Sequence, residues 1–262
     1  MTALDGFTET TFTFDSVTRP VYRAGSGPGV VVVHEVPGIT PLVADFGRRV
    51  IDAGFTVAMP SLFGEPGRTM SVPYVMKSMS GACVSREFAT WALNRTSPVV
   101  EWLRALARDL HAQAGGPGVG AVGMCLTGGF ALAMAVDDEM LAPVLSQPSM
   151  PMPLGKARSR ALGLSDADLA RVKDRAVNDG LCVLGLRFSK DPAVPDGRWA
   201  QYREQLGDNF IGVDIDSSPG NPHGIKRTAH SVLTEHFVDQ PGHPTKEALD
   251  RVIAFLREKL KS

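Results

Sequence analysis

The chain alternates short apolar runs with longer stretches in which apolar residues recur at helical spacing. Residues 30–33 are four consecutive valines, which is typical of a strand buried on both faces of a parallel sheet. Further short apolar runs predict strands at 55–60, 119–123, 141–147, 181–188 and 210–213. Helical spacing predicts helices at 42–51, 98–110, 128–136, 165–178, 195–206 and 245–261. This alternation predicts an α/β fold with a mostly parallel central sheet and helices on both faces.

The two remaining parts of the pattern are an N-terminal hairpin and a long excursion. Residues 8–22 alternate between apolar and polar and are interrupted at Asp15 and Pro20, as an edge hairpin would be. We expect one domain over residues 1–262, with a cap-like excursion at about 64–96 that is too apolar for a solvated loop. We expect Trp91 to line a substrate pocket there; the alternative is a packing helix on the flank of the domain.

A strand, a sharp turn and a helix are predicted around Cys125. Gly123 and Gly128 flank this cysteine in a G-x-C-x-x-G pattern, which resembles a nucleophile elbow with a thiol in place of the hydroxyl. A cysteine at the start of a helix is favoured as a thiolate by the unpaired N–H groups there. The alternative is an inert, buried cysteine at an ordinary strand–helix junction.

A nucleophilic thiol needs a base, and the base needs an acid that fixes its tautomer. In this fold class they follow in the order nucleophile, acid and histidine, and Cys125, Asp191 and His230 satisfy that order. Asp196 and His223 are the nearest substitutes. We favour His230 because Pro222 and Gly224 make His223 look like a turn residue.

Composition narrows the classes of function. The formal net charge is −1 and the basic residues are scattered, which argues against a nucleic-acid partner and favours a small molecule. The three cysteines share no metal-ligand spacing, so we expect no metal, no organic cofactor and a reducing compartment. The sequence has no signal peptide and no apolar run long enough for a membrane, which predicts a cytoplasmic protein. Its oligomeric state is left open.

Glu35 is a further candidate because it directly follows the valine run. Charged groups seldom stand beside a central strand without a partner. We interpret Glu35 as a polar neighbour of the thiol; the alternative is a solvated loop residue.

Together these motifs resemble the dienelactone hydrolases (carboxymethylenebutenolidase-like) of the α/β-hydrolase superfamily. The similarity rests on residues 34–38, the elbow at 123–128, Asp191 with Pro195, and residues 229–231. It implies a hydrolase of small esters or lactones with a Cys-His-Asp triad. It also implies an oxyanion hole formed by the N–H groups of Val36 and Leu126, and a Glu35 that holds the resting thiol.

Two residues depart from the family pattern. Thr127 stands where the elbow usually has a second glycine, and Thr234 stands where a carboxylate-binding arginine is expected. Arg86 or Arg95 in the excursion could supply that charge. Two other classes stay open: a non-catalytic binding protein with an α/β-hydrolase fold, and a redox-active thiol protein in which Cys83 or Cys182 resolves an oxidised Cys125.

Overall fold

One sheet of eight strands forms the centre of the molecule, in the order β1-β2-β4-β3-β5-β6-β7-β8. The structure is a computed structural model and describes residues 2–84, 97–150 and 159–261. Pairs from β4 through β8 are parallel, whereas β1 with β2 and β2 with β4 are antiparallel. The strands are β1 (Thr8–Phe14), β2 (Val17–Gly25), β3 (Gly29–Val33), β4 (Thr56–Pro60), β5 (Val119–Met124), β6 (Met140–Ser146), β7 (Val183–Phe188) and β8 (Phe210–Ile215).

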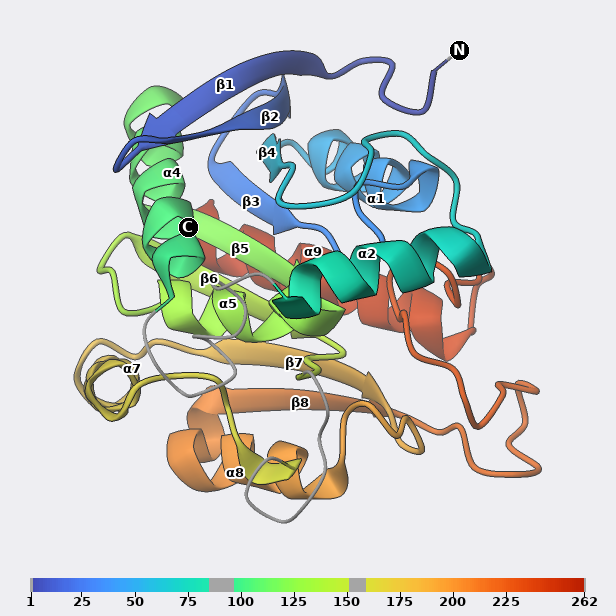
Figure 1. Cartoon of the computed structure of the whole chain (residues 1–262). Coiled ribbons are helices and arrows are strands. Elements are labelled where there is room, and N and C mark those ends of the chain that lie inside the picture. The colour runs from blue at the N-terminus through green and yellow to red at the C-terminus, as the bar shows by residue number, and fades with distance from the viewer. Residues whose placement is uncertain (1, 85–96, 151–158, 262) are drawn as a thin grey trace.

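Helices cover both faces of this sheet. Figure 1 shows α9 behind the central strands and α4 and α5 in front of them. The buried apolar side chains accordingly form two clusters, one with α1 and α9 and the other with α4, α5, α7 and α8. The helices are α1 (Pro41–Asp52), α2 (Val72–Val84), α4 (Pro98–Ala114), α5 (Gly128–Met134), α7 (Asp166–Asn178), α8 (Asp196–Leu206) and α9 (Pro244–Leu260).

The predicted mostly parallel α/β sheet is confirmed, including the edge hairpin and all six predicted strands. The helix after the elbow is shorter than predicted, because it ends at Met134 rather than reaching residue 136. The start of the excursion, for which no regular element was predicted, contains α2. In that helix Tyr74 is buried and its hydroxyl contacts the backbone of Glu65, while Val72 and Met76 are exposed.

Among the helices within residues 2–84, 97–150 and 159–261, none is both long enough and apolar enough to cross a bilayer.

The carboxyl end of β3 is anchored by a buried histidine. The His34 ring is fully buried, with Nδ1 2.9 Å from the carbonyl oxygen of Glu35 and Nε2 accepting the N–H of Leu62 at 3.0 Å. Because Nε2 accepts, Nδ1 must carry the proton in a neutral ring. Burial lowers the pKa of His34 from 6.5 to about 4. The ring therefore fixes the loop after β3 to the loop after β4 only while it is neutral.

This coupling predicts a pH-dependent stability. Above pH 6.5 the ring is neutral in both the folded and the unfolded chain, and the full stability is present. Between pH 6.5 and about 4 only the unfolded chain takes up the proton, so the free energy of unfolding should fall by roughly 3 kcal/mol. Measured by urea unfolding across this pH range, the free energy of unfolding should fall less for His34→Gln than for the wild type.

The exposed His223 provides the control, because His223→Gln should keep the wild-type pH dependence. An equally steep fall in His34→Gln and the wild type would contradict the role assigned to His34.

Candidate active site

Cys125 lies on a turn that holds an unusual backbone conformation. It directly follows β5 and has a φ of +57°, which costs free energy for any residue with a side chain. Gly123 permits this turn, because a Cβ there would lie 2.2 Å from the carbonyl oxygen of Thr127. Gly128 permits the start of α5 to pack closely against Pro148, since a Cβ at this position would lie 2.7 Å from Cα of Pro148. The glycines at both ends of the motif therefore have a steric function.

Asp191 and His230 meet at the carboxyl ends of β7 and β8. The distance from Asp191 Oδ2 to His230 Nδ1 is 2.6 Å, and the Asp191 side chain is 2% exposed. The N–H of Ala193 donates to Asp191 Oδ1 at 2.9 Å and thereby orients the carboxylate. Asp196 is exposed and pairs with Arg187 instead.

The imidazole of His230 contacts this carboxylate and also interacts electrostatically with Cys125. Its Nδ1 is occupied by Asp191, so Nε2 is the ring atom left for Cys125. Burial opposes the charged imidazolium, but the negative charge of Cys125 and hydrogen bonds with Asp191 and Cys125 outweigh it. They raise the pKa of His230 well above its usual value of 6.5. This environment favours the charged imidazolium form of His230.

Glu35 is buried, and its carboxyl group accepts hydrogen bonds from three side chains. Ser231 donates to Oε2 at 2.7 Å, the Gln147 amide donates to Oε2 at 3.1 Å, and Thr234 donates to Oε1. The hydrogen bonds found for Glu35 thus join it to the loops after β6 and β8. The sulfur of Cys125 has another neighbour, Ser149, whose Oγ lies 3.2 Å away. Contact between Glu35 and the thiol stays a prediction.

Comparison with known proteins identifies the family. The dienelactone hydrolase family matches residues 17–260. The chain belongs to the dienelactone hydrolase family. This confirms the predicted family and the predicted class of enzyme, a carboxylic ester or lactone hydrolase.

Individual relatives are more distant. A protein of Saccharomyces cerevisiae (strain ATCC 204508 / S288c) named "Putative carboxymethylenebutenolidase" is 25% identical over 217 residues, which cover 81% of this chain and 70% of that protein. The crystal structure of "Putative Dienelactone Hydrolase" from Klebsiella pneumoniae subsp. pneumoniae MGH 78578 has a TM-score of 0.65 and 19% identity, and covers 96% of this chain and 98% of that one. The crystal structure of a dienelactone hydrolase-like promiscuous phosphotriesterase from metagenomic libraries has a TM-score of 0.64 and 18% identity, and covers 97% of this chain and 98% of that one. At this level of identity the structures confirm the α/β-hydrolase fold.

Thr127 departs from the family pattern, and its side chain ties the elbow to β3. It is fully buried, and its Oγ1 accepts the N–H of Met124 at 2.9 Å. The same hydroxyl lies 2.9 Å from the carbonyl oxygen of Val33 and 3.1 Å from that of His34. In this member of the family a threonine therefore links the nucleophile turn to the strand whose loop carries Val36.

The two N–H groups expected to form the oxyanion hole come from neighbouring loops. Leu126 directly follows the thiol and is buried, and Val36 lies in the turn after β3. The N–H of Val36 donates no hydrogen bond to the part of the chain that the structure describes. It is therefore available to an oxygen of a ligand.

Sequence reasoning missed three polar residues at the site. Ser149 and Gln147 follow β6, and nothing in their spacing indicated a role. His236 was not among the candidate residues, yet its Nδ1 accepts the N–H groups of His230 and Ser231 at 3.4 and 3.3 Å. Burial lowers the pKa of His236, which keeps that acceptor free of a proton. Its position six residues after His230 was the signal available.

The remaining candidates have separate outcomes. Arg86, Arg95 and Trp91 lie outside the described residues, as does the side chain of Cys83. Cys182 lies at the amino end of β7, close to Asn209, whereas Cys125 lies at the carboxyl end of β5. His223 stacks edge-on against His243, with 5.3 Å between the ring centroids. No group of three or more metal-ligating side chains occurs within residues 2–84, 97–150 and 159–261.

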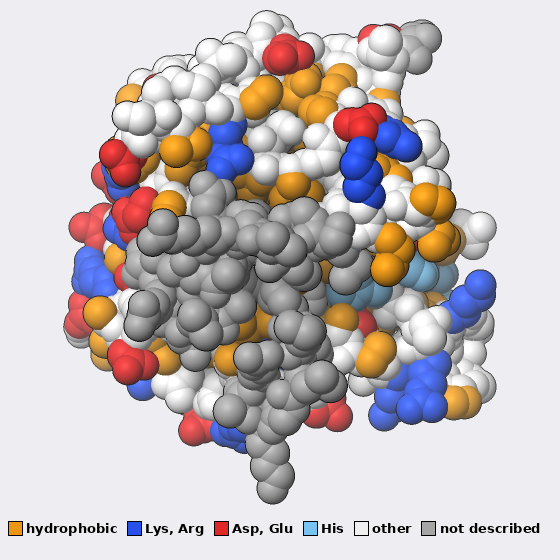
Figure 2. Space-filling model, in the orientation of Figure 1, with side chains coloured by type: hydrophobic (Ala, Val, Ile, Leu, Met, Phe, Trp, Pro, Cys, Tyr) orange, Lys and Arg blue, Asp and Glu red, His pale blue; other side chains and the backbone are white. Residues whose placement is uncertain are grey.

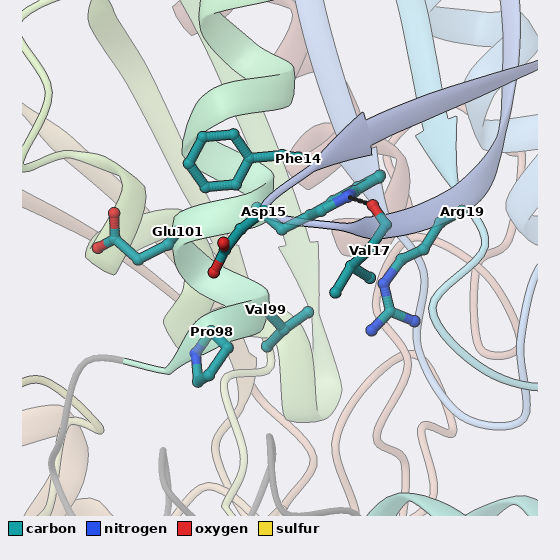
Figure 3. A pocket seen from close by; sticks show the side chains of 8 residues that line it. Phe14, Asp15, Val17, Arg19, Pro98, Val99 and Glu101 are labelled. Carbon is teal, nitrogen blue, oxygen red and sulfur yellow. Dashed lines mark hydrogen bonds between the residues drawn. The ribbon is translucent and has the colours of Figure 1, made fainter.

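A hollow of about 410 Å³ lies apart from these residues, between the β1–β2 turn and the start of α4. Figure 3 shows Phe14, Asp15 and Val17 facing Pro98 and Val99 across it. The indole N–H of Trp102 donates to the carbonyl oxygen of Val17 at 3.0 Å and closes one side. None of the predicted catalytic residues lines this hollow.

On the face shown in Figure 2, histidine side chains reach the surface among hydrophobic ones.

The Glu35 cluster generates a prediction about stability. Replacing Glu35 with leucine leaves the donors of Ser231, Thr234 and Gln147 without an acceptor in a buried place. The free energy of unfolding should fall by about 2–5 kcal/mol, and Glu35→Gln should lose less because it keeps the shape and one acceptor. Urea unfolding at pH 7.5 measures both.

Glu235, an exposed carboxylate on the same loop, is the matched control, and Glu235→Leu should change the free energy little. If Glu35→Leu proved no more destabilising than this control, the three hydrogen bonds would not be holding the loops.

Proposed function

We propose that this enzyme hydrolyses small carboxylic esters or lactones through a triad of Cys125, His230 and Asp191. One observation carries the proposal: Nδ1 of His230 lies 2.6 Å from a buried aspartate, and the charge of Cys125 at the elbow helps to raise the pKa of the same imidazole. Groups brought together in this order of nucleophile, base and acid are those that acyl transfer requires. The S. cerevisiae relative, named for carboxymethylenebutenolidase, supports the same substrate class.

In the proposed reaction the thiolate of Cys125 attacks the carbonyl carbon, and the carbonyl oxygen becomes an oxyanion that accepts the N–H groups of Val36 and Leu126. When this intermediate collapses, the C–O bond to the alkoxide breaks and His230 gives the alkoxide its proton. The product is a thioester on Cys125. The now neutral His230 takes a proton from water, and the hydroxide formed attacks the thioester to release the acid and the thiolate.

Asp191 has a positioning role in this scheme. Its carboxylate fixes the tautomer of His230 and stabilises the imidazolium that donates to the leaving group. The scheme uses no metal and no organic cofactor, and its partner is a small molecule rather than a nucleic acid. A free thiol nucleophile fits a reducing compartment such as the cytoplasm.

The redox alternative needs a second thiol beside Cys125. Cys182 lies at the opposite end of the parallel strands, so it gives this alternative no support. The binding-protein alternative requires none of the three residues to be near the others. The Asp191–His230 contact and the influence of Cys125 on the pKa of His230 therefore support hydrolysis over both.

One prediction of this proposal concerns the nucleophile. Cys125→Ala should lower kcat/KM for p-nitrophenyl acetate by at least ~10³-fold, because no other group replaces the attacking thiolate. Cys182→Ala is the matched control and should retain wild-type rates. Turnover by Cys125→Ala at the wild-type rate would end the proposal.

A second prediction concerns pH. The imidazolium of His230 must protonate an alkoxide, so kcat/KM for a lactone should decline as pH rises through the raised pKa of His230. Asp191→Asn removes a charge that raises this pKa, so it should move the decline to lower pH and reduce the rate by at least ~10-fold. The decline should be weaker with p-nitrophenyl acetate, whose leaving group needs no proton.

Asp196→Asn serves as the control because Asp196 is an exposed carboxylate that pairs with Arg187, and it should leave the pH profile in place. An unchanged profile in Asp191→Asn would remove Asp191 from the triad.

A further inference from the structure

We infer that Ser149 is a further catalytic residue, whose hydroxyl donates a hydrogen bond to the Cys125 thiolate. Ser149 and His230 would then both stabilise the negative charge on the sulfur. The inference rests on the proposed function, in which Cys125 is the nucleophile. Ser149 Oγ lies 3.2 Å from Cys125 Sγ, and the Ser149 side chain is buried. A second bond joins the same two residues, because the N–H of Ser149 donates to the carbonyl oxygen of Cys125 at 2.9 Å.

The loop that carries Ser149 is built against the elbow. Gln147, directly after β6, has a φ of +34°, a conformation that side chains disfavour. Its N–H is held by the carbonyl oxygen of Leu186 in β7 at 2.7 Å. The next residue, Pro148, lies so close to Gly128 that any Cβ there would collide with it. The backbone on both sides of this contact is therefore fixed, and Ser149 points at the sulfur as a consequence.

The side chain of Gln147 holds the loop from a further direction. Its amide donates to Glu35 at 3.1 Å, and its Oε1 accepts the N–H of Val232 at 3.2 Å. Val232 lies two residues after His230, so the loop of Ser149 and the loop of the histidine are connected. The thiol thus has the hydroxyl of Ser149 as a neighbour at 3.2 Å, and it also raises the pKa of the His230 imidazole.

The chemistry of the hydroxyl decides what this arrangement does. A serine O–H can donate to a sulfur anion, and hydrogen bonds to charged acceptors are stronger than those between neutral groups. The thiolate gains more from this donor than the thiol does. Ser149 should therefore keep a larger fraction of the sulfur ionised at a given pH, and hold it in one rotamer in front of His230.

Ser149→Ala tests this inference, because it removes the hydroxyl and keeps the backbone N–H bond to Cys125. The measurement is the rate at which iodoacetamide alkylates Cys125 between pH 4 and 10, followed by mass spectrometry on the peptide that contains it. The midpoint of this profile should move to higher pH, and below the wild-type midpoint the rate should fall about tenfold. The acidic limb of kcat/KM should move in the same direction.

Ser149→Thr and Ser149→Val form a matched pair that differ in the hydroxyl and have nearly the same volume. The threonine should keep the wild-type midpoint and the valine should behave like alanine, so the comparison holds even if Ser149→Ala does not fold. Ser217→Ala is the structural control, because Ser217 is also a buried serine but its Oγ accepts the backbone N–H of Lys190. It should leave the midpoint where it is.

The inference is overturned if Ser149→Ala and Ser149→Val unfold more easily but keep the wild-type midpoint, since Ser149 would then be structural. Failure of the proposed function has a different signature: Cys125→Ala would stay active, whatever the alkylation profile of Ser149→Ala.

Discussion

The buried carboxyl group of Glu35 is the constraint on which the site depends. A charged residue can follow a central strand only if donors surround it, because a buried polar group without partners costs several kcal/mol. Its donors come from the loops after β6 and β8, through Gln147, Ser231 and Thr234. The loop that carries Val36 is thereby fixed relative to the loop that carries His230. Side chains from three distant parts of the sequence are held in one arrangement.

A second set of contacts fixes the elbow against the same loops. The hydroxyl of Thr127 reaches the end of β3, and Ser149 reaches the sulfur from the loop after β6. Backbone strain at Cys125 and Gln147 is tolerated because these hydrogen bonds and the close contact at Gly128 leave no other arrangement. The site is thus preorganised by polar contacts that lie above an apolar sheet.

The sequence was sufficient for the fold and for the order of the candidate residues. Hydrophobic period and steric arguments were enough to interpret the four valines of β3, the glycines around Cys125 and the apolar face of α9. Each of these signals lies within a short stretch of sequence. The preference for His230 over His223 also came from local turn chemistry. By contrast, Ser149, Gln147 and His236 act through contacts between loops, and no periodicity indicates which loops meet. The partners of Glu35 could not be predicted for the same reason.

The departures from the family pattern have a physical meaning of the same kind. Threonine at 127 replaces a small residue with a cross-link between strand and elbow, and threonine at 234 gives Glu35 a neutral donor. Both threonines connect loops through their hydroxyl groups, and at 234 a neutral side chain stands where the family pattern has an arginine.

The central claim is that the acyl group passes through Cys125. Its most direct test is rapid acid quenching of the enzyme during turnover of a small lactone, followed by mass spectrometry of the intact chain and its peptides. The account predicts that the peptide containing Cys125 gains the mass of the lactone and that the adduct disappears as substrate is exhausted. Turnover with no adduct at Cys125, or with the adduct on another residue, would contradict it.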